Sequence, residues 1–199
     1  NVNTELNKKL KKFIRSRSSW CASSTHYNEE KFCGLVHLKL KEKCKNPLTI
    51  LIPRHVNRVK SIENELKNLK LKVHLDEPKK QISADTDIYL VNSYGKTRSF
   101  YKECKCVFLG GSLIKHGGQN PLEAVRYGCK IFHGPNVSNF SEIYKFLKNK
   151  SLSKKVINNQ NLANLLLSNF KNKIQSKKII KNLHLIGKNV LNKTYKEIC

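Results

Sequence analysis

Short apolar runs of strand length alternate with segments of helical period over most of the chain, from residue 20 to residue 157. Residues 48–53 read Leu-Thr-Ile-Leu-Ile-Pro, an almost unbroken apolar run that Pro53 closes. A strand that is apolar on both sides is typical of a parallel sheet with helices on both faces. The alternation therefore predicts the α/β class and, within it, a doubly wound, Rossmann-like parallel sheet.

The expected strands share a length of three to six residues and an apolar character. They cover residues 20–22, 48–53, 72–75, 88–91, 105–109, 130–133 and 155–157. The segments with helical spacing lie between or after them, at 28–45, 56–69, 97–103, 121–127, 138–148, 161–170 and 173–191. One more helix is expected at the N-terminus, with its cap at Asn3 or Thr4 and an apolar face of Leu6, Leu10, Phe13 and Ile14.

The chain of 199 residues has a formal net charge of +25, and 39% of its residues are hydrophobic. This apolar share suits a folded domain with a core, and no apolar run approaches the roughly 18 residues of a membrane helix. The basic residues are mostly Lys, and no aromatic residues interleave with them as a nucleic-acid stacking surface would require. We interpret the charge mainly as a Lys-rich solvated surface. Attraction to an anionic membrane or phosphorylated lipid is the second reading, and nucleic-acid binding the third.

Seven cysteines are present, an odd number without any CxxC pair. This spacing favours small buried thiols in a reducing cytoplasm over disulfides or a metal site. We therefore expect no metal. The cysteines are Cys21, Cys33, Cys44, Cys104, Cys106, Cys129 and Cys199.

A glycine-rich segment is the strongest functional signal, because it follows a predicted strand and leads into a predicted helix. Residues 110–123 read GGSLIKHGGQNPLE. Glycines there permit positive φ and close backbone approach to a ligand. Asn120 can cap the helix that Pro121 begins, and free N–H groups at such a helix start favour a phosphate. In an open parallel sheet, loops at the carboxyl ends of the strands form the ligand crevice.

Four ordered segments resemble those of the 3-deoxy-D-manno-octulosonic acid (Kdo) transferases. Residues 110–128, GGSLIKHGGQNPLEAVRYG, are similar to the family's GGS-L-x-x-x-GG-x-NPLE string. Residues 20–30 resemble its W-x-A-x-STH-x-x-EE segment, residues 52–55 its VPRH turn, and residues 134–140 its GP-x-x-x-NF turn. The likeness covers about residues 20–147. It implies the C-terminal half of a GT-B fold, with C-terminal helices, that binds CMP-Kdo.

Two departures from the family pattern concern donor contacts. Residues 92–97, NSYGKT, stand where the family usually has a glycine-rich acidic stretch, and they keep Gly95 but not the acids. Gln119 stands before Asn120 where His is common, and His116 lies three residues upstream.

The resemblance and the loop positions together give an expected donor-binding set. Backbone of the glycine turn and Ser112 would line the phosphate or the cytosine, and Asn120 and Glu123 would contact phosphate and ribose. Arg54 would add a charge-assisted hydrogen bond, with a surface ion pair as the alternative. The set is Ser24, Thr25, His26, Arg54, Gly110, Gly111, Ser112, Gly118, Asn120 and Glu123.

Other polar residues near these loops have open readings. His26 would touch the sugar or the leaving phosphate, or be a turn histidine with a structural hydrogen bond. Glu29 and Glu30 are read as acids of a first helical turn rather than as catalysts. Asn139 would begin a helix near the crevice, and Phe140 is expected to pack rather than to stack on a base.

The resemblance implies an inverting transfer of Kdo from CMP-Kdo to a lipid A precursor in lipopolysaccharide biosynthesis. Its general base would be a carboxylate of an N-terminal domain, so we expect no catalytic residue here, and no cofactor beyond the substrate CMP-Kdo. Expected partners are CMP-Kdo, the lipid acceptor, a membrane surface and that N-terminal domain, at the cytoplasmic face of the bacterial inner membrane. The alternatives are another GT-B transferase or epimerase with a uridine donor, and a non-catalytic basic remnant.

These readings divide the chain into three parts. Residues 1–19 would be an N-terminal helix and linker from a further N-terminal domain, 20–170 the donor-binding Rossmann-like domain, and 171–199 a C-terminal helix. The chain begins with Asn1 and contains no Met, so we expect a processed product, a trimmed chain or a fragment.

Overall fold

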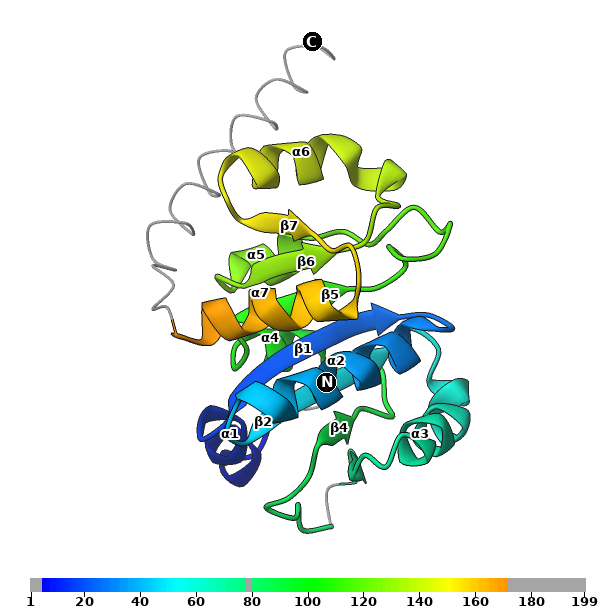
Figure 1. The fold of residues 1–199 in the computed structure, drawn as a ribbon, viewed down its shortest axis with the longest axis vertical. Helices are drawn as coiled ribbons and strands as arrows, with labels where there is room; N and C mark the ends of the chain where they lie inside the picture. The colour runs from blue at the N-terminus through cyan, green and yellow to red at the C-terminus, as the bar shows by residue number, and fades with distance from the viewer. Residues whose placement is uncertain (1–4, 78–79, 172–199) are drawn as a thin grey trace.

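A computed structural model describes residues 5–77 and 80–171. Within these ranges seven strands form one sheet in the order β3-β4-β2-β1-β5-β6-β7 (Figure 1). Every neighbouring pair is parallel, as the apolar runs predict. The strands are β1 (Ser18–Thr25), β2 (Pro47–Pro53), β3 (Val73–Leu75), β4 (Ile88–Leu90), β5 (Cys106–Leu109), β6 (Lys130–His133) and β7 (Ser153–Lys155).

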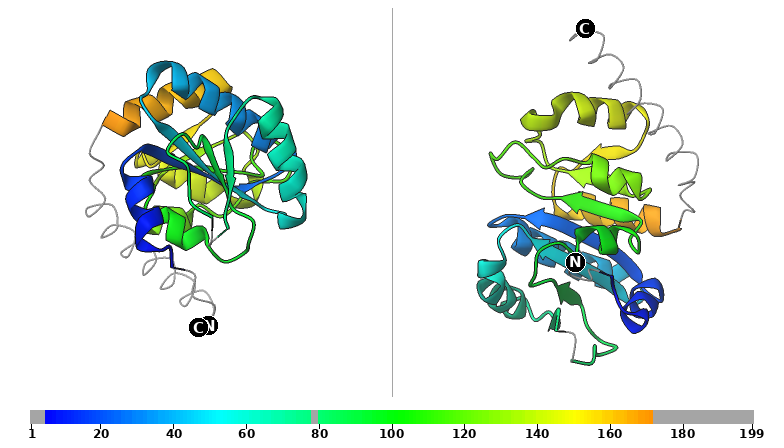
Figure 2. Two further views of the ribbon diagram at one scale, coloured as in Figure 1. Left: turned by 90° about the horizontal axis from the view of Figure 1, so that it is seen from below. Right: turned by 180° about the vertical axis from the view of Figure 1, so that it is seen from behind.

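Helices cover both faces of the sheet, so the doubly wound α/β prediction is confirmed (Figure 2). One face packs against the apolar sides of α2 (Glu29–Lys43), α3 (Val59–Asn68) and α7 (Asn159–Lys171). The other face packs against four shorter helices. These are α1 (Lys8–Arg15), α4 (Thr97–Tyr101), α5 (Leu122–Arg126) and α6 (Ser141–Asn149).

Strand β1 shows how the sequence supplies two cores from one central strand. Its side chains alternate between the faces, so Cys21 joins the core under α1 and α4, whereas Trp20 and Ala22 join the core under α2. Each of the three is fully buried. Burial on both sides explains why this strand and β2 contain few charged residues.

Several boundaries differ from the sequence predictions. Helix α1 begins after Asn7, whose Oδ1 accepts a hydrogen bond from the Leu10 amide at 2.8 Å, and Leu6 precedes the helix. The predicted caps Asn3 and Thr4 lie outside the described residues, as do Cys199 and the predicted helix at 173–191. The last strand is Ser153–Lys155 rather than 155–157.

Two predicted helices begin instead with a 3₁₀ turn. The turns are η1 (Val56–Arg58) before α3 and η2 (Ser138–Phe140) before α6. Such tight turns are common at helix starts and leave the hydrophobic spacing nearly unchanged, which is why the spacing did not separate them.

Of the six described cysteines, five are buried and Cys44 is half-buried; none forms a disulfide. Burial raises the pKa of the Cys21 and Cys33 thiols, because an apolar surrounding disfavours the thiolate. The expectation of buried, inert thiols is confirmed for these residues. In the described parts of the chain, no helix combines the length and apolar character needed to cross a membrane.

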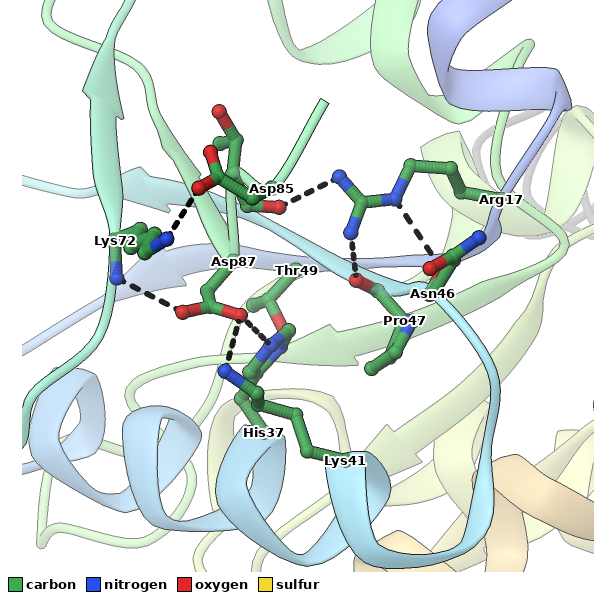
Figure 3. Close-up of polar contacts among 10 residues, drawn as sticks. Arg17, His37, Lys41, Asn46, Pro47, Thr49, Lys72, Asp85 and Asp87 are labelled. Carbon is green, nitrogen blue, oxygen red and sulfur yellow. Dashed lines mark hydrogen bonds and ion pairs between the residues drawn. The ribbon is translucent and has the colours of Figure 1, made fainter. Parts of the chain in front are cut away.

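At the amino edge of the sheet, the buried carboxylate of Asp87 forms hydrogen bonds and ion pairs that join several elements (Figure 3). Asp87, just before β4, accepts a hydrogen bond from the Lys72 amide at 2.9 Å and pairs with Lys41 at 2.8 Å. Its Oδ1 lies 3.2 Å from Nε2 of His37, whose Nδ1 lies 2.9 Å from the Thr49 hydroxyl. This network ties α2 to β2, β3 and β4 at the edge opposite the candidate site.

Candidate functional site

The loops that follow β1, β2 and β5 meet at the carboxyl edge of the sheet. Strand order runs outward in both directions from β1, so the boundary between β1 and β5 is a topological switch point, where such sheets bind ligands. The loops are tied to one another through the backbone. The amide of Arg54 donates to the Thr25 carbonyl, and the amide of Gly110 donates to the Ser23 carbonyl, each at 2.9 Å.

The glycine turn after β5 is shaped by close approach to its own chain. A Cβ on Gly110 would overlap the backbone of Ser24 and Thr25. Gly111 has a φ of +66°, and a Cβ there would lie 2.9 Å from the His116 ring. The positive φ that the sequence predicts is therefore present. The atoms that a Cβ at Gly110 or Gly111 would approach too closely belong to the β1 loop and to the glycine turn itself.

Glu29 holds this turn in place, a role that the sequence analysis missed. It is the first residue of α2 and its side chain is 1% exposed. Its carboxylate accepts hydrogen bonds from the amides of Gly111 at 2.7 Å, Ser112 at 3.1 Å and Leu113 at 2.9 Å. It also accepts from the amide of His26 at 2.9 Å. A solvated first-turn acid and this buried carboxylate have the same sequence pattern. The sequence therefore could not distinguish the two roles.

Ser112 joins the loops after β5 and β6. It has no exposed surface, and its hydroxyl donates to the Leu109 carbonyl at 2.6 Å and accepts from the Gly134 amide at 2.8 Å. A Cβ on Gly134 would overlap the Ser112 backbone. In this structure the Ser112 hydroxyl is thus engaged within the protein, and not presented to the crevice as the sequence analysis expected.

Three histidines gather where the β1, β2 and glycine-turn loops meet. The ring centroid of His26 lies 4.4 Å from that of His116 and 5.6 Å from that of His55. His26 is buried, whereas His55 and His116 are exposed. Nε2 of His26 is shielded from solvent and has no hydrogen-bond partner among the described residues. The position of His26 after β1 was expected from the sequence, but its grouping with His55 and His116 was not.

Burial, together with repulsion from the nearby His116, His55, Arg54 and Arg58, lowers the pKa of His26 to about 4. At neutral pH the imidazole is uncharged. It therefore offers one donor and one acceptor nitrogen and carries no positive charge of its own.

The two arginines after β2 have different positions. Arg58 is half-buried, donates to both oxygens of the fully buried Glu30 at 3.0 and 3.2 Å, and lies over the Tyr27 ring at 5.4 Å. Burial raises the pKa of Glu30, although Arg58 acts in the opposite direction. Arg54 is exposed at the end of β2. Glu30 thus neutralises Arg58 and leaves Arg54 as the cation facing outward.

Asn120 and Glu123 flank the start of α5. Oδ1 of Asn120 accepts from the Leu122 amide at 3.0 Å. The cap position of α5 is Pro121 rather than Asn120, so the predicted helix start is one residue too early. Glu123 accepts from Nε of the exposed Arg98 at 2.7 Å. An exposed pair of this kind contributes little free energy, so a ligand hydroxyl can compete with it. Contacts of Asn120 and Glu123 with phosphate and ribose stay predictions.

The remaining predicted residues line or support the same edge. Thr25 is buried at the end of β1, and Ser24 is half-buried with a φ of 56°. The amide of Gly118 donates to the Gly111 carbonyl at 2.9 Å, which closes the glycine turn. Asn139 donates from Nδ2 to the His116 carbonyl at 3.2 Å. Phe140 packs against the core, as expected.

No group of three or more His, Cys, Asp or Glu is arranged to hold a metal ion in residues 5–77 and 80–171. What the edge offers is one exposed arginine, one buried neutral imidazole with an unpartnered nitrogen, and two exposed imidazoles. These groups suit an anionic ligand with hydrogen-bond acceptors.

No family model matches the chain. Curated 3-deoxy-D-manno-octulosonic acid transferases do. The protein of Haemophilus influenzae is 32% identical over 151 residues, which cover 74% of this chain and 35% of the relative. That of Rickettsia typhi is 33% identical over 167 residues, which cover 84% of this chain and 36% of the relative. The chain thus spans about a third of the length of these relatives.

A solved structure has the same fold. The C-terminal CMP-Kdo binding domain of WaaA from Acinetobacter baumannii matches with a TM-score of 0.77 and 24% identity, over 87% of this chain and 91% of that domain. The resemblance found in the sequence is therefore confirmed by both comparisons. The chain is a relative of the 3-deoxy-D-manno-octulosonic acid transferases, with the fold of a GT-B C-terminal domain.

Proposed function

We propose that this chain binds the donor CMP-Kdo and serves the transfer of Kdo to a lipid A precursor in lipopolysaccharide biosynthesis. The observation that carries the proposal is the grouping of Arg54 with three histidines at the switch point between β1 and β5, in a chain related to Kdo transferases. CMP-Kdo has one negative phosphate and one sugar carboxylate. Arg54 and the histidines around His26 are the side chains that would meet these charges.

In the transfer, the bond between the sugar anomeric carbon and the CMP phosphate breaks, and charge accumulates on the leaving phosphate. Arg54 would stabilise that charge, with about 1.5–3 kcal/mol for a charge-assisted hydrogen bond. The neutral His26 would donate or accept one hydrogen bond through Nε2. The proton of the acceptor hydroxyl would go to a carboxylate of an N-terminal domain, which we propose as the partner of this chain.

The acceptor, the membrane and the location belong to the same proposal. We propose that the chain acts on a lipid A precursor at the cytoplasmic face of the bacterial inner membrane. The net charge of +25 supports attraction to anionic lipid. Helix α1 is one basic surface that could face it, because its exposed side chains include Lys8, Lys9, Lys12 and Arg15. Cosedimentation with vesicles that contain or lack anionic lipid would test this, and equal binding to both would contradict it.

Calorimetric titration of CMP and UMP into the chain, with Glu123→Ala beside it, tests the donor. We expect CMP to bind more tightly than UMP, and Glu123→Ala to weaken CMP, because a carboxylate can accept both ribose hydroxyls. Tighter binding of UMP would favour the second candidate, a uridine-nucleotide transferase or epimerase. A bifunctional glycosyltransferase/methyltransferase of Fusobacterium nucleatum, 29% identical over 155 residues, shows that related chains occur in other enzymes. Absence of binding would favour a remnant or a need for the partner domain.

A further inference from the structure

We propose that Glu29 is a positioning residue: it locks the β1 loop to the glycine turn and so sets the spacing of the groups that bind the donor phosphate. The inference rests on the proposed function and adds a residue to it. Glu29 would not touch the donor. It would act through His26 and His116, which lie on the two loops that it joins.

The Glu29 carboxylate is saturated by backbone donors. Oε2 accepts from the amides of His26 and Gly111, and Oε1 accepts from those of Ser112 and Leu113. An ionised carboxylate has about four acceptor positions, so these four bonds use its capacity. Hydrogen bonds from N–H groups to a carboxylate are short and strong, and here they are buried. Glu29 is thus a fixed part of the site's frame.

The anchor spans the switch point of the sheet. Glu29 begins the helix after β1, and Gly111 lies 82 residues further on, after the neighbouring strand β5. The bond between the Gly118 amide and the Gly111 carbonyl closes the turn that carries His116. One carboxylate thus holds both the β1 loop, which carries His26, and the glycine turn, which carries His116. This places the two ring centroids 4.4 Å apart.

The anchor also decides which groups remain for a ligand. Consecutive backbone amides in a tight turn form a concave site for anions. In this chain the amides of Gly111, Ser112 and Leu113 already bind an anion, the side chain of Glu29. A donor phosphate would therefore be met by side chains such as Arg54 and His26. The expectation that the glycine-turn backbone lines the phosphate therefore does not extend to the amides of Gly111, Ser112 and Leu113.

Removal of the Glu29 charge should weaken CMP binding if Glu29 positions the loops, and tighten it if Glu29 acts only as a nearby negative charge. A carboxylate close to an anion-binding site repels the anion, so removing its charge should tighten binding if the charge were all that mattered. Glu29→Gln keeps one oxygen but turns an amide donor toward two of the four backbone donors. We expect it to open the turn and to weaken CMP about tenfold or more. Cytidine, which lacks the phosphate, should change far less.

The experiment compares the whole chain with Glu29→Gln and with the matched control Glu63→Gln. Glu63 is another buried acid, held by Lys60 and Lys67 on α3, and has no contact with the glycine turn. One readout is calorimetric binding of CMP and cytidine. The second needs no ligand: the nuclear Overhauser contact between the His26 and His116 rings should disappear in Glu29→Gln and persist in Glu63→Gln.

Each outcome decides something. Equal or tighter CMP binding by Glu29→Gln, or an unchanged contact between the two rings, would overturn the inference. Failure of the wild type to bind CMP would contradict donor binding by this chain alone, and the ring contact would still report on the anchor. If Glu29→Gln does not fold, amide exchange in the wild type replaces it. The Gly111, Ser112 and Leu113 amides should stay protected when CMP is added, and loss of protection would show that the ligand displaces Glu29.

Discussion

Arg58 and Glu30 form a two-bond ion pair, at 3.0 and 3.2 Å, in which the carboxylate is fully buried and the guanidinium half-buried. Removing Arg58 would leave a fully buried carboxyl group without its partner. We expect Arg58→Gln to lower the free energy of unfolding by about 3 kcal/mol, the usual result of breaking one side of a buried pair. Urea unfolding would measure this. Lys72→Gln, which removes an exposed lysine from a pair with the exposed Asp85, should change stability little; equal losses would contradict the assignment.

Asp87 should contribute strongly to stability at the amino edge of the sheet. Its side chain is 5% exposed and has bonds to His37, Lys41 and the Lys72 amide. Asp87→Asn should cost about 3 kcal/mol, because it uncouples buried partners. Asp85→Asn is the matched control, since the side chain of Asp85 is 56% exposed and pairs with Lys72 at the surface. A loss for Asp85→Asn as large as that for Asp87→Asn would contradict this account.

The stability of the protein should fall as the pH falls below about 6.5. Burial lowers the pKa of His26 to about 4 in the folded chain, and burial also lowers that of His37. The unfolded chain has the ordinary histidine value, so it binds more protons in this window. A depressed folded pKa gives stability that is present above 6.5 and is lost toward 4.

Urea midpoints from pH 7.5 to pH 4.5 would test this slope. His26→Gln should make the decline shallower, because it removes one of the four histidines whose pKa burial lowers, the others being His37, His74 and His133. His55→Gln, at an exposed neighbour, is the control and should leave the slope close to that of the wild type. A slope unchanged by His26→Gln would contradict the neutral, buried state of this imidazole.

Gly110→Ala should disturb both stability and the crevice. The new Cβ would overlap the backbone of Ser24, which cannot move without shifting β1. We expect a loss of about 1–3 kcal/mol, as for other overpacked positions. Gly34→Ala in α2 is the control. Its Cβ would meet the ends of the Leu66, Leu69 and Leu71 side chains, at 2.8, 2.9 and 3.3 Å, which can rotate away. A larger loss at Gly34 than at Gly110 would count against a rigid turn.

The sequence was sufficient to predict the sheet. Buried parallel strands such as β2 carry an apolar run on both faces, and this is visible without coordinates. The placement of these loops at one edge also followed, because parallel strands place all their carboxyl ends at the same edge. His26, Arg54 and the glycine turn were therefore found together at that edge.

The fine structure of the site could not be predicted, because it depends on contacts between distant segments. Glu29 and Glu30 are adjacent and identical in type, yet one binds four backbone amides and the other an arginine. Their sequence context fits two first-turn acids equally well. Ser112 likewise occupies a loop position suited to a ligand, but its hydroxyl bonds link two loops of the protein. Such choices are set by the placement of β5 beside β1 and of β6 beside β5.

Binding of CMP to the wild type and to Arg54→Gln, with Arg15→Gln as control, tests the central claim most directly. Arg54 lies at the switch-point crevice, whereas Arg15 is exposed at the end of α1. We predict that Arg54→Gln weakens CMP by about tenfold or more, with the unfolding midpoint unchanged, and that Arg15→Gln binds as the wild type does. Equal affinity of Arg54→Gln and the wild type would contradict a donor site at the carboxyl ends of β1, β2 and β5.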